Sequence, residues 1–295
     1  MTSLPVEHQV RCLEVWGGTE AVDRTLAVPG IDAWIFCEPY GGHSSGGDIH
    51  YVSSCFTGRV ARFAVADVAG HGQHASDLAD KLRRLMKKHI NFLDQTGLAR
   101  VLNQEFSELS QEGRFATALL MSYFAPTDHL VICNAGHPRP LWFQAAKGRW
   151  QWLDDENPDT TAAPNNLPLG LIDPTSYVQF SVPLGAGDLV LLYTDWLVEA
   201  ESPSGRQLGE TGLFELVCAA TPRPAGNSAP AGAQRVDPKV VGREILIAAA
   251  AHRGNRAFDD DRTLVLLHHN ATPVPHRPIR GAIRAIAGLL GLAGD

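Results

Sequence analysis

The order of the predicted elements along this 295-residue chain indicates an α+β fold made of layers, with largely antiparallel sheets. Short apolar runs of strand type come first, and a stretch of helical periodicity follows them. More strands, then helices and one final strand complete the chain. Because runs of strands are separate from runs of helices, antiparallel pairing is favoured over the strict alternation that parallel sheets need.

The first half of the chain supplies three strands and two helices. Thr57-Gly58-Arg59 separates two segments of strand type and predicts a hairpin. From Ala75 to Leu93 the apolar residues recur at steps of three and four with charged residues between them, which predicts an amphipathic helix. The remaining elements expected here are strands 31–37, 48–56 and 60–68 and a helix over 97–110.

The second half is expected to contain six further strands and two helices, separated by two polar or Pro/Gly-rich segments, 154–166 and 221–233. Strands are predicted at 116–124, 129–135, 141–143, 178–182, 189–194 and 263–268. Helices are predicted at 209–219 and 240–252.

Composition excludes several classes of function. The formal net charge of −7 argues against a general nucleic-acid binder, which needs a basic face. The five cysteines are dispersed without a CxxC pair, which favours reduced thiols and a cytoplasmic protein. Neither a signal peptide nor an apolar stretch long enough to span a membrane is found in the sequence.

We predict three parts: an N-terminal extension (1–30), a main domain (31–270), and a Pro-rich linker with an amphipathic C-terminal helix (271–295). In the last part, apolar residues from Ile279 to Leu290 share one helical face, with arginines nearby. We expect this helix to dock on its own domain or on a twin subunit, in preference to a membrane surface or another partner.

Four aspartates are candidates for a metal site: Asp48, Asp67, Asp195 and Asp260. Each stands at the end of an apolar strand or in a tight turn among small residues, where the sheet fixes its backbone and the carboxylate faces a cleft. Converging carboxylates bind hard divalent cations. Taken singly, each except Asp67 is better explained as a cap or turn residue, and only the set of four favours a site.

The motifs GGD, ADVAGHG, FATALL, NAGHPRPLW, LPLGL, GDLVLLYTD, VEA and DDRT occur in this order over about 31–270. This series resembles the PPM-type (type 2C) metal-dependent serine/threonine phosphatases, in their SpoIIE-like bacterial branch. The resemblance implies an αββα sandwich of two antiparallel sheets flanked by helices. It also implies two Mn²⁺ or Mg²⁺ ions between the sheets, which activate a water to attack phosphorus.

By the same resemblance, Asp67 bridges both metals and the Val68 carbonyl is a backbone ligand, while Asp48, Asp195 and Asp260 complete the set. His71 is a candidate general acid for the leaving oxygen. It is at least as good an explanation that GHG forms a tight turn in which the His71 imidazole has a structural role. His137, in NAGHP, is interpreted as part of a hairpin that supports the core and is left out of the site.

Two positions depart from the family pattern. Trp196 replaces the glycine that follows the TD aspartate, so its ring must point away from the metals or narrow the cleft. Tyr51 stands where an aspartate is often seen. Neither change removes a predicted ligand.

Three functions remain open. The first is a phosphatase acting on phosphoserine or phosphothreonine of a small regulatory protein, by resemblance an anti-sigma-factor antagonist. The second is a pseudophosphatase that only binds its partner, and the third is a hydrolase of small phosphoesters. Retention of all four carboxylates argues against the pseudophosphatase, because clustered charges repel one another without metal.

Overall fold

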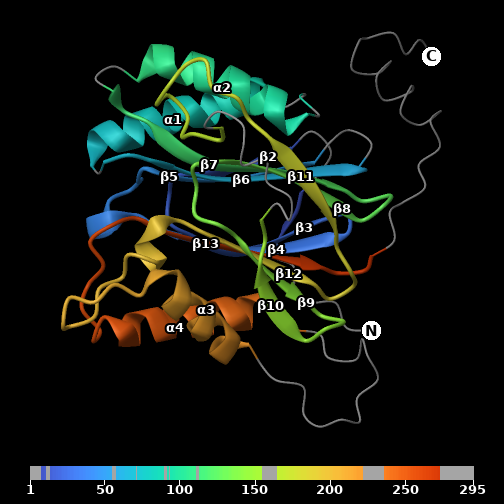
Figure 1. Cartoon of the computed structure of the whole chain (residues 1–295), viewed down its shortest axis with the longest axis vertical. Helices are drawn as coiled ribbons and strands as arrows, with labels where there is room; N and C mark the ends of the chain where they lie inside the picture. The colour runs from blue at the N-terminus through green and yellow to red at the C-terminus, as the bar shows by residue number, and fades with distance from the viewer. Residues whose placement is uncertain are drawn as a thin grey trace.

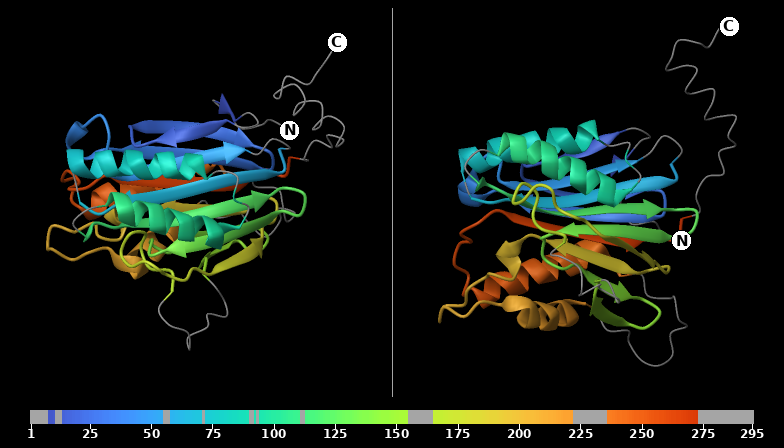
Figure 2. Two further views of the ribbon diagram at one scale, coloured as in Figure 1. Left: turned by 90° about the horizontal axis from the view of Figure 1, so that it is seen from above. Right: turned by 45° about the horizontal axis from the view of Figure 1, so that its top comes forward.

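Two β-sheets pack face to face, and each is covered on its outer face by a pair of helices (Figures 1 and 2). The molecule is described here from a computed structural model. The structure describes residues 8–10, 14–54, 58–70, 72–89, 92, 94–110, 113–154, 165–221 and 236–272. The predicted α+β sandwich is confirmed.

All neighbouring strands pair antiparallel except the edge pair β1–β3, which is parallel. The seven-stranded sheet has the order β1 (His8–Gln9), β3 (Val22–Val28), β4 (Ile31–Glu38), β13 (Arg262–His269), β12 (Leu189–Tyr193), β9 (Leu141–Gln144) and β10 (Arg149–Trp152). The six-stranded sheet has the order β11 (Gln179–Pro183), β8 (His129–Ala135), β7 (Ala116–Phe124), β6 (Val60–Val68), β5 (Asp48–Ser54) and β2 (Val15–Gly18).

Helices α1 (Gln73–Lys88) and α2 (Gln95–Leu109) cover the six-stranded sheet, whereas α3 (Gly209–Ala220) and α4 (Pro238–His252) cover the seven-stranded one (Figure 1). Two of the helices begin at an aspartate cap. The Asp94 carboxylate accepts a hydrogen bond from the Gly97 amide, and the Asp237 carboxylate accepts one from the Lys239 amide. Such caps satisfy amide groups that have no partner within the helix.

Apolar side chains fill three layers: one between the sheets and one beneath each helical pair. The two-residue period of a strand decides which side chains enter which layer. In β6, Phe63 and Val65 face the core between the sheets, while Ala64, Ala66 and Val68 face the helices. Asp67 therefore points into the space between the sheets, as a ligand for an inter-sheet ion must.

Several elements differ from the prediction. Strands β1, β2, β3 and β10 were not predicted, and the first three place residues of the expected N-terminal extension in both sheets. The predicted end of strand 48–56 lies outside the described residues, which include β5 up to Ser54, and α1 ends at Lys88 rather than at residue 93. Short, half-exposed strands of mixed composition carry little periodic signal.

The predicted C-terminal helix and the ring of His71 lie outside the described residues, as do 155–164 and 222–235. Among the residues that the structure describes, no helix is long and apolar enough to cross a membrane.

Candidate metal centre

The four predicted aspartates come to one end of the sandwich, two from each sheet. Asp48 opens β5 and lies directly opposite Asp67 in the register of β5 and β6. On the facing sheet, Asp195 begins the short 3₁₀ turn Asp195–Leu197 that follows β12, and Asp260 comes shortly before β13. Since β12 and β13 pair antiparallel, the end of one adjoins the start of the other. The fold thus brings together residues more than 200 positions apart.

The pKa shifts of three of these carboxylates indicate that the acidic side chains lie close together. Burial and then the charge of Asp67 raise the pKa of Asp48 well above its usual value. The pKa of Asp67 is likewise raised, first by burial and then by the charges of Asp195 and Asp260. Burial, followed by the charges of Asp260 and Glu199, raises the pKa of Asp195 to about 6. Buried like charges of this kind are relieved by a cation.

Thr194 fixes the carboxylate of Asp48 from the opposite sheet. Its hydroxyl donates a hydrogen bond to Asp48 Oδ2 over 2.7 Å and accepts one from the Thr263 amide over 3.2 Å. Thr194 is completely buried. The threonine of the TD motif is therefore a positioning residue that sequence reasoning missed, although its place before the aspartate was a usable signal.

The structure also separates Asp260 from its neighbour Asp261. The Asp261 carboxylate is buried and accepts hydrogen bonds from the amides of Tyr40 (2.7 Å) and Gly47 (2.6 Å). Asp261 thereby holds the turn that leads into Asp48. Asp260, in contrast, is exposed, and one of its oxygens accepts a bond from the Asp261 amide. Asp261 is therefore occupied by backbone amides, and Asp260 as the metal ligand stays a prediction.

Gly47 is needed because the backbone passes close to a predicted ligand. A Cβ at Gly47 would lie 3.1 Å from the Val68 carbonyl oxygen, and one at Gly46 would lie 2.4 Å from an oxygen of Asp261. The two glycines of GGD therefore let this turn approach both β6 and the Asp261 carboxylate.

Trp196 points away from the carboxylates. It is 3% exposed, belongs to the apolar layer beneath α3 and α4, and donates its indole N–H to the Thr263 carbonyl over 3.1 Å. Its ring meets Phe258 edge-on, with centroids 5.1 Å apart. Tyr51 also faces away from the site, into the layer beneath α1 and α2. Neither departure from the family pattern places its side chain between the sheets.

A hard divalent cation fits this set of donors. All predicted side-chain ligands are carboxylates, the Val68 carbonyl adds another oxygen, and the acids raise one another's pKa. Within the described part of the chain, no three His, Cys, Asp or Glu side chains already surround one point as ligands of a single ion. His71 is outside the described residues, so its role stays a prediction.

Comparison with known proteins identifies the family. The sequence profile of the family "Stage II sporulation protein E (SpoIIE)" matches residues 57–270. A search of curated protein sequences found no match.

Solved structures share the fold. The RsbU and RsbW domains of a Mycobacterium tuberculosis protein are 21% identical, with a TM-score of 0.63, covering 94% of this chain and 72% of that one. The PP2C phosphatase domain of SpoIIE from Bacillus subtilis, solved with a fragment of its regulatory domain, is 16% identical with a TM-score of 0.60. That match covers 88% of this chain and 64% of the other.

RsbX in complex with magnesium is also similar, at 16% identity and a TM-score of 0.56, covering 84% of this chain and 99% of RsbX. At these identities the structures establish the fold, whereas the profile establishes membership. The chain therefore belongs to the SpoIIE family and has the fold of the PP2C-type phosphoprotein phosphatases.

Proposed function

We propose that this protein is an active, metal-dependent serine/threonine phosphatase whose ions are held by Asp48, Asp67, Asp195 and Asp260 with the Val68 carbonyl. The observation that carries the proposal is the convergence of carboxylates from both sheets: Asp48 lies opposite Asp67 in β5 and β6, and their neighbours Asp195 and Asp260 lie at the adjoining ends of β12 and β13. Without a cation, such a cluster is electrostatically costly, because Asp48 is buried and Asp67 and Asp195 are half-buried. Its retention is best explained by ion binding.

Each part of the chain has a distinct task in this proposal. The sheets hold the ligand backbones, Thr194 orients Asp48, and Asp261 holds the GGD turn. Two Mn²⁺ or Mg²⁺ ions, when bound, supply a water of lowered pKa and stabilise charge on the phosphoryl oxygens. The general acid that we propose for the leaving oxygen is His71.

The proposed substrate is a phosphoserine or phosphothreonine on a small regulatory protein of the anti-sigma-factor-antagonist type, in the cytoplasm. Similarity to a chain that contains an RsbU domain, and to RsbX, supports this class of substrate. A hydrolase of small phosphoesters is the alternative, and a panel that contains both kinds of substrate separates the two.

The test is Mn²⁺-dependent release of phosphate from a phosphoserine peptide by wild type, Asp67→Asn and Asp77→Asn. Asp77 is an exposed acid of α1 and serves as the matched control. We expect Asp67→Asn to lose more activity than the roughly 10- to 100-fold that loss of an outer-shell partner causes. Full activity in Asp67→Asn would overturn the site. Tight metal binding without turnover of any phosphoprotein would favour the pseudophosphatase.

A further inference from the structure

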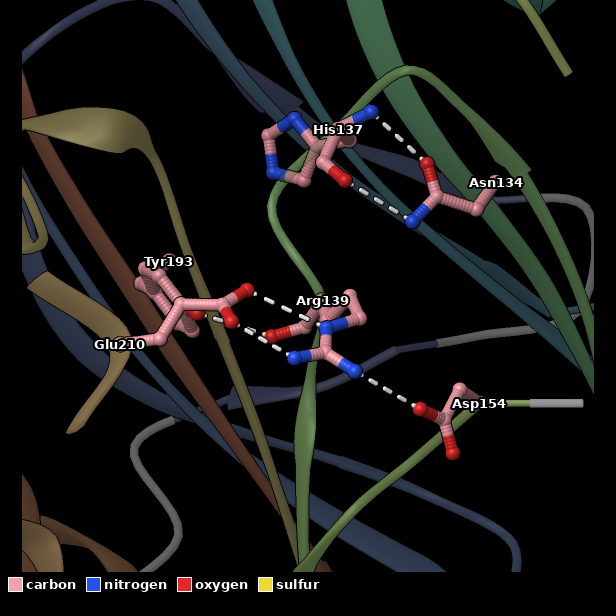
Figure 3. A network of polar contacts seen from close by, with 6 residues as sticks. All are labelled: Asn134, His137, Arg139, Asp154, Tyr193 and Glu210. Atoms are coloured by element: carbon pink, nitrogen blue, oxygen red, sulfur yellow. Dashed lines mark hydrogen bonds and ion pairs between the residues drawn. The ribbon is translucent and has the colours of Figure 1, made fainter. Parts of the chain in front are cut away.

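One short segment links the two sheets close to the candidate metal centre. Residues 136–140 lead from β8 in the six-stranded sheet to β9 in the seven-stranded sheet. Figure 3 shows how the segment is held at its start: the Asn134 amide oxygen accepts a bond from the His137 amide, and its NH₂ donates to the His137 carbonyl. These bonds measure 2.7 and 2.9 Å and fix the backbone on both sides of the His137 ring.

The His137 ring contacts the sheet that carries Asp67. Its Nδ1 is 2.9 Å from the Thr117 hydroxyl, and the side chain is 5% exposed. Thr117 lies directly opposite Asp67 in the register of β6 and β7. Side chains at opposed positions in adjacent antiparallel strands lie close together on the same face. The ring is therefore one residue removed from the predicted bridging ligand.

The same segment contacts the strand that ends at Asp195. The Tyr193 hydroxyl donates a hydrogen bond of 2.9 Å to the Arg139 carbonyl (Figure 3). The Nε2 of the His137 ring is buried and makes no hydrogen bond within the described part of the chain. Tyr193 is the last residue of β12, two positions before Asp195. Either Thr117 or His137 is the donor in the bond between them, depending on which ring nitrogen carries the proton.

Ion pairs hold the far end of the segment to two further elements. The Arg139 guanidinium binds both carboxylate oxygens of Glu210 in α3, at 3.1 and 2.6 Å, and one oxygen of Asp154 at 2.9 Å (Figure 3). The same group covers the ring of Trp152 at 4.7 Å from its centroid. The segment is thus fixed at both ends, which allows it to set a distance between sheets.

We propose that His137 is a positioning residue that holds Asp67, through Thr117, in place relative to Asp195 on the facing sheet. The inference rests on the proposed function, since it concerns ligands of the same metal site. A site made from two sheets works only if their ligands are held to within about 0.5 Å of the required geometry.

The test measures Mn²⁺ binding by calorimetry, which needs no turnover. Thr117→Val removes the hydroxyl and keeps the shape, while Thr117→Ser restores a hydroxyl. His137→Phe removes both ring nitrogens. We expect Thr117→Val and His137→Phe to weaken Mn²⁺ binding by about 10-fold or more, as loss of outer-shell partners does. Thr117→Ser should bind within about threefold of wild type.

Ser122→Ala is the matched control. Ser122 lies in the same strand, and its buried hydroxyl accepts a 2.8 Å hydrogen bond from Gln95. Its loss should lower the melting temperature comparably and leave Mn²⁺ affinity unchanged. Wild-type affinity in folded Thr117→Val, or an equal loss in Ser122→Ala, overturns the positioning role alone. Absence of Mn²⁺ binding by wild type overturns the proposed metal site and the positioning role together.

Discussion

The hydroxyl of Thr194 donates a 2.7 Å hydrogen bond across the sandwich to Asp48 Oδ2, which joins the end of β12 to the start of β5. The two residues are 146 positions apart in sequence. This bond passes from one sheet to the other at the end where the four aspartates meet. It satisfies one oxygen of a buried carboxylate.

Thr194→Val should weaken Mn²⁺ binding by about 10- to 100-fold, because an outer-shell partner orients its ligand. It should also lower the free energy of unfolding by about 1–3 kcal/mol, since the buried Thr263 amide loses its acceptor. Calorimetric titration and denaturant unfolding measure the two effects. Thr194→Ser, which keeps the hydroxyl, should restore both, and wild-type Mn²⁺ affinity in Thr194→Val would contradict the role assigned to this bond.

Asp260→Asn and Asp261→Asn should fail in different ways. Loss of the Asp260 charge should abolish metal-dependent phosphate release with little change in melting temperature, because this side chain is exposed. Asp261→Asn replaces one acceptor by a donor that faces an amide N–H of Tyr40 or Gly47. It should therefore lower stability by about 1–3 kcal/mol. Asp77→Asn, at an exposed acid of α1, is the control for both measurements, and loss of stability in Asp260→Asn alone would reverse the assignment.

The sequence singled out four aspartates that the fold brings to one end of the sandwich, because these candidate ligands stand at the ends of strongly apolar strands. Strands β5, β6, β12 and β13 each contain a clear run of buried residues. The order of the motifs along the chain then indicates which aspartate near each strand end belongs to the candidate set. The partners of those ligands could not be predicted in this way. Whether Thr194 reaches Asp48, or Asp261 reaches Gly47, depends on how two sheets face each other, and one-dimensional periodicity holds no such information.

The strands that were not predicted illustrate the same limit of one-dimensional periodicity. β3 pairs with β4 along its whole length, yet it contains Asp23 and Arg24 and lacks clean alternation. Tertiary pairing, rather than local preference, makes it a strand. The orientation of the Trp196 side chain could not be predicted from the sequence either. A tryptophan beside a candidate ligand can either narrow the cleft or pack into the core.

Trp196→Gly should destabilise the protein without creating a faster enzyme. The ring is buried against Phe258 and bonded to the Thr263 carbonyl, which also accepts the Thr194 amide, so removal of the ring leaves mainly a large cavity. Truncation of a buried tryptophan costs about 3–5 kcal/mol. Denaturant unfolding measures this loss, with Trp196→Phe as the milder control. A rise in kcat/KM per folded molecule of Trp196→Gly would show instead that the ring restricts the cleft.

Mn²⁺ affinity should fall as the pH drops below about 6, because protons compete with the metal for carboxylates whose pKa values are raised. The pKa of Asp195 is raised to about 6 in the metal-free protein, and those of Asp48 and Asp67 are raised as well. Below that pH the acid must release a proton on binding, so affinity decreases by about tenfold per pH unit for each proton released. Above about pH 7 Asp195 is already ionised, and its contribution to the pH dependence disappears.

Calorimetry at pH 5.0, 6.0 and 7.5 in buffers of different ionisation enthalpy gives both the affinity and the number of protons released. Asp195→Asn should bind more weakly and show a shallower slope, while an unchanged slope would mean that this carboxylate is not a ligand.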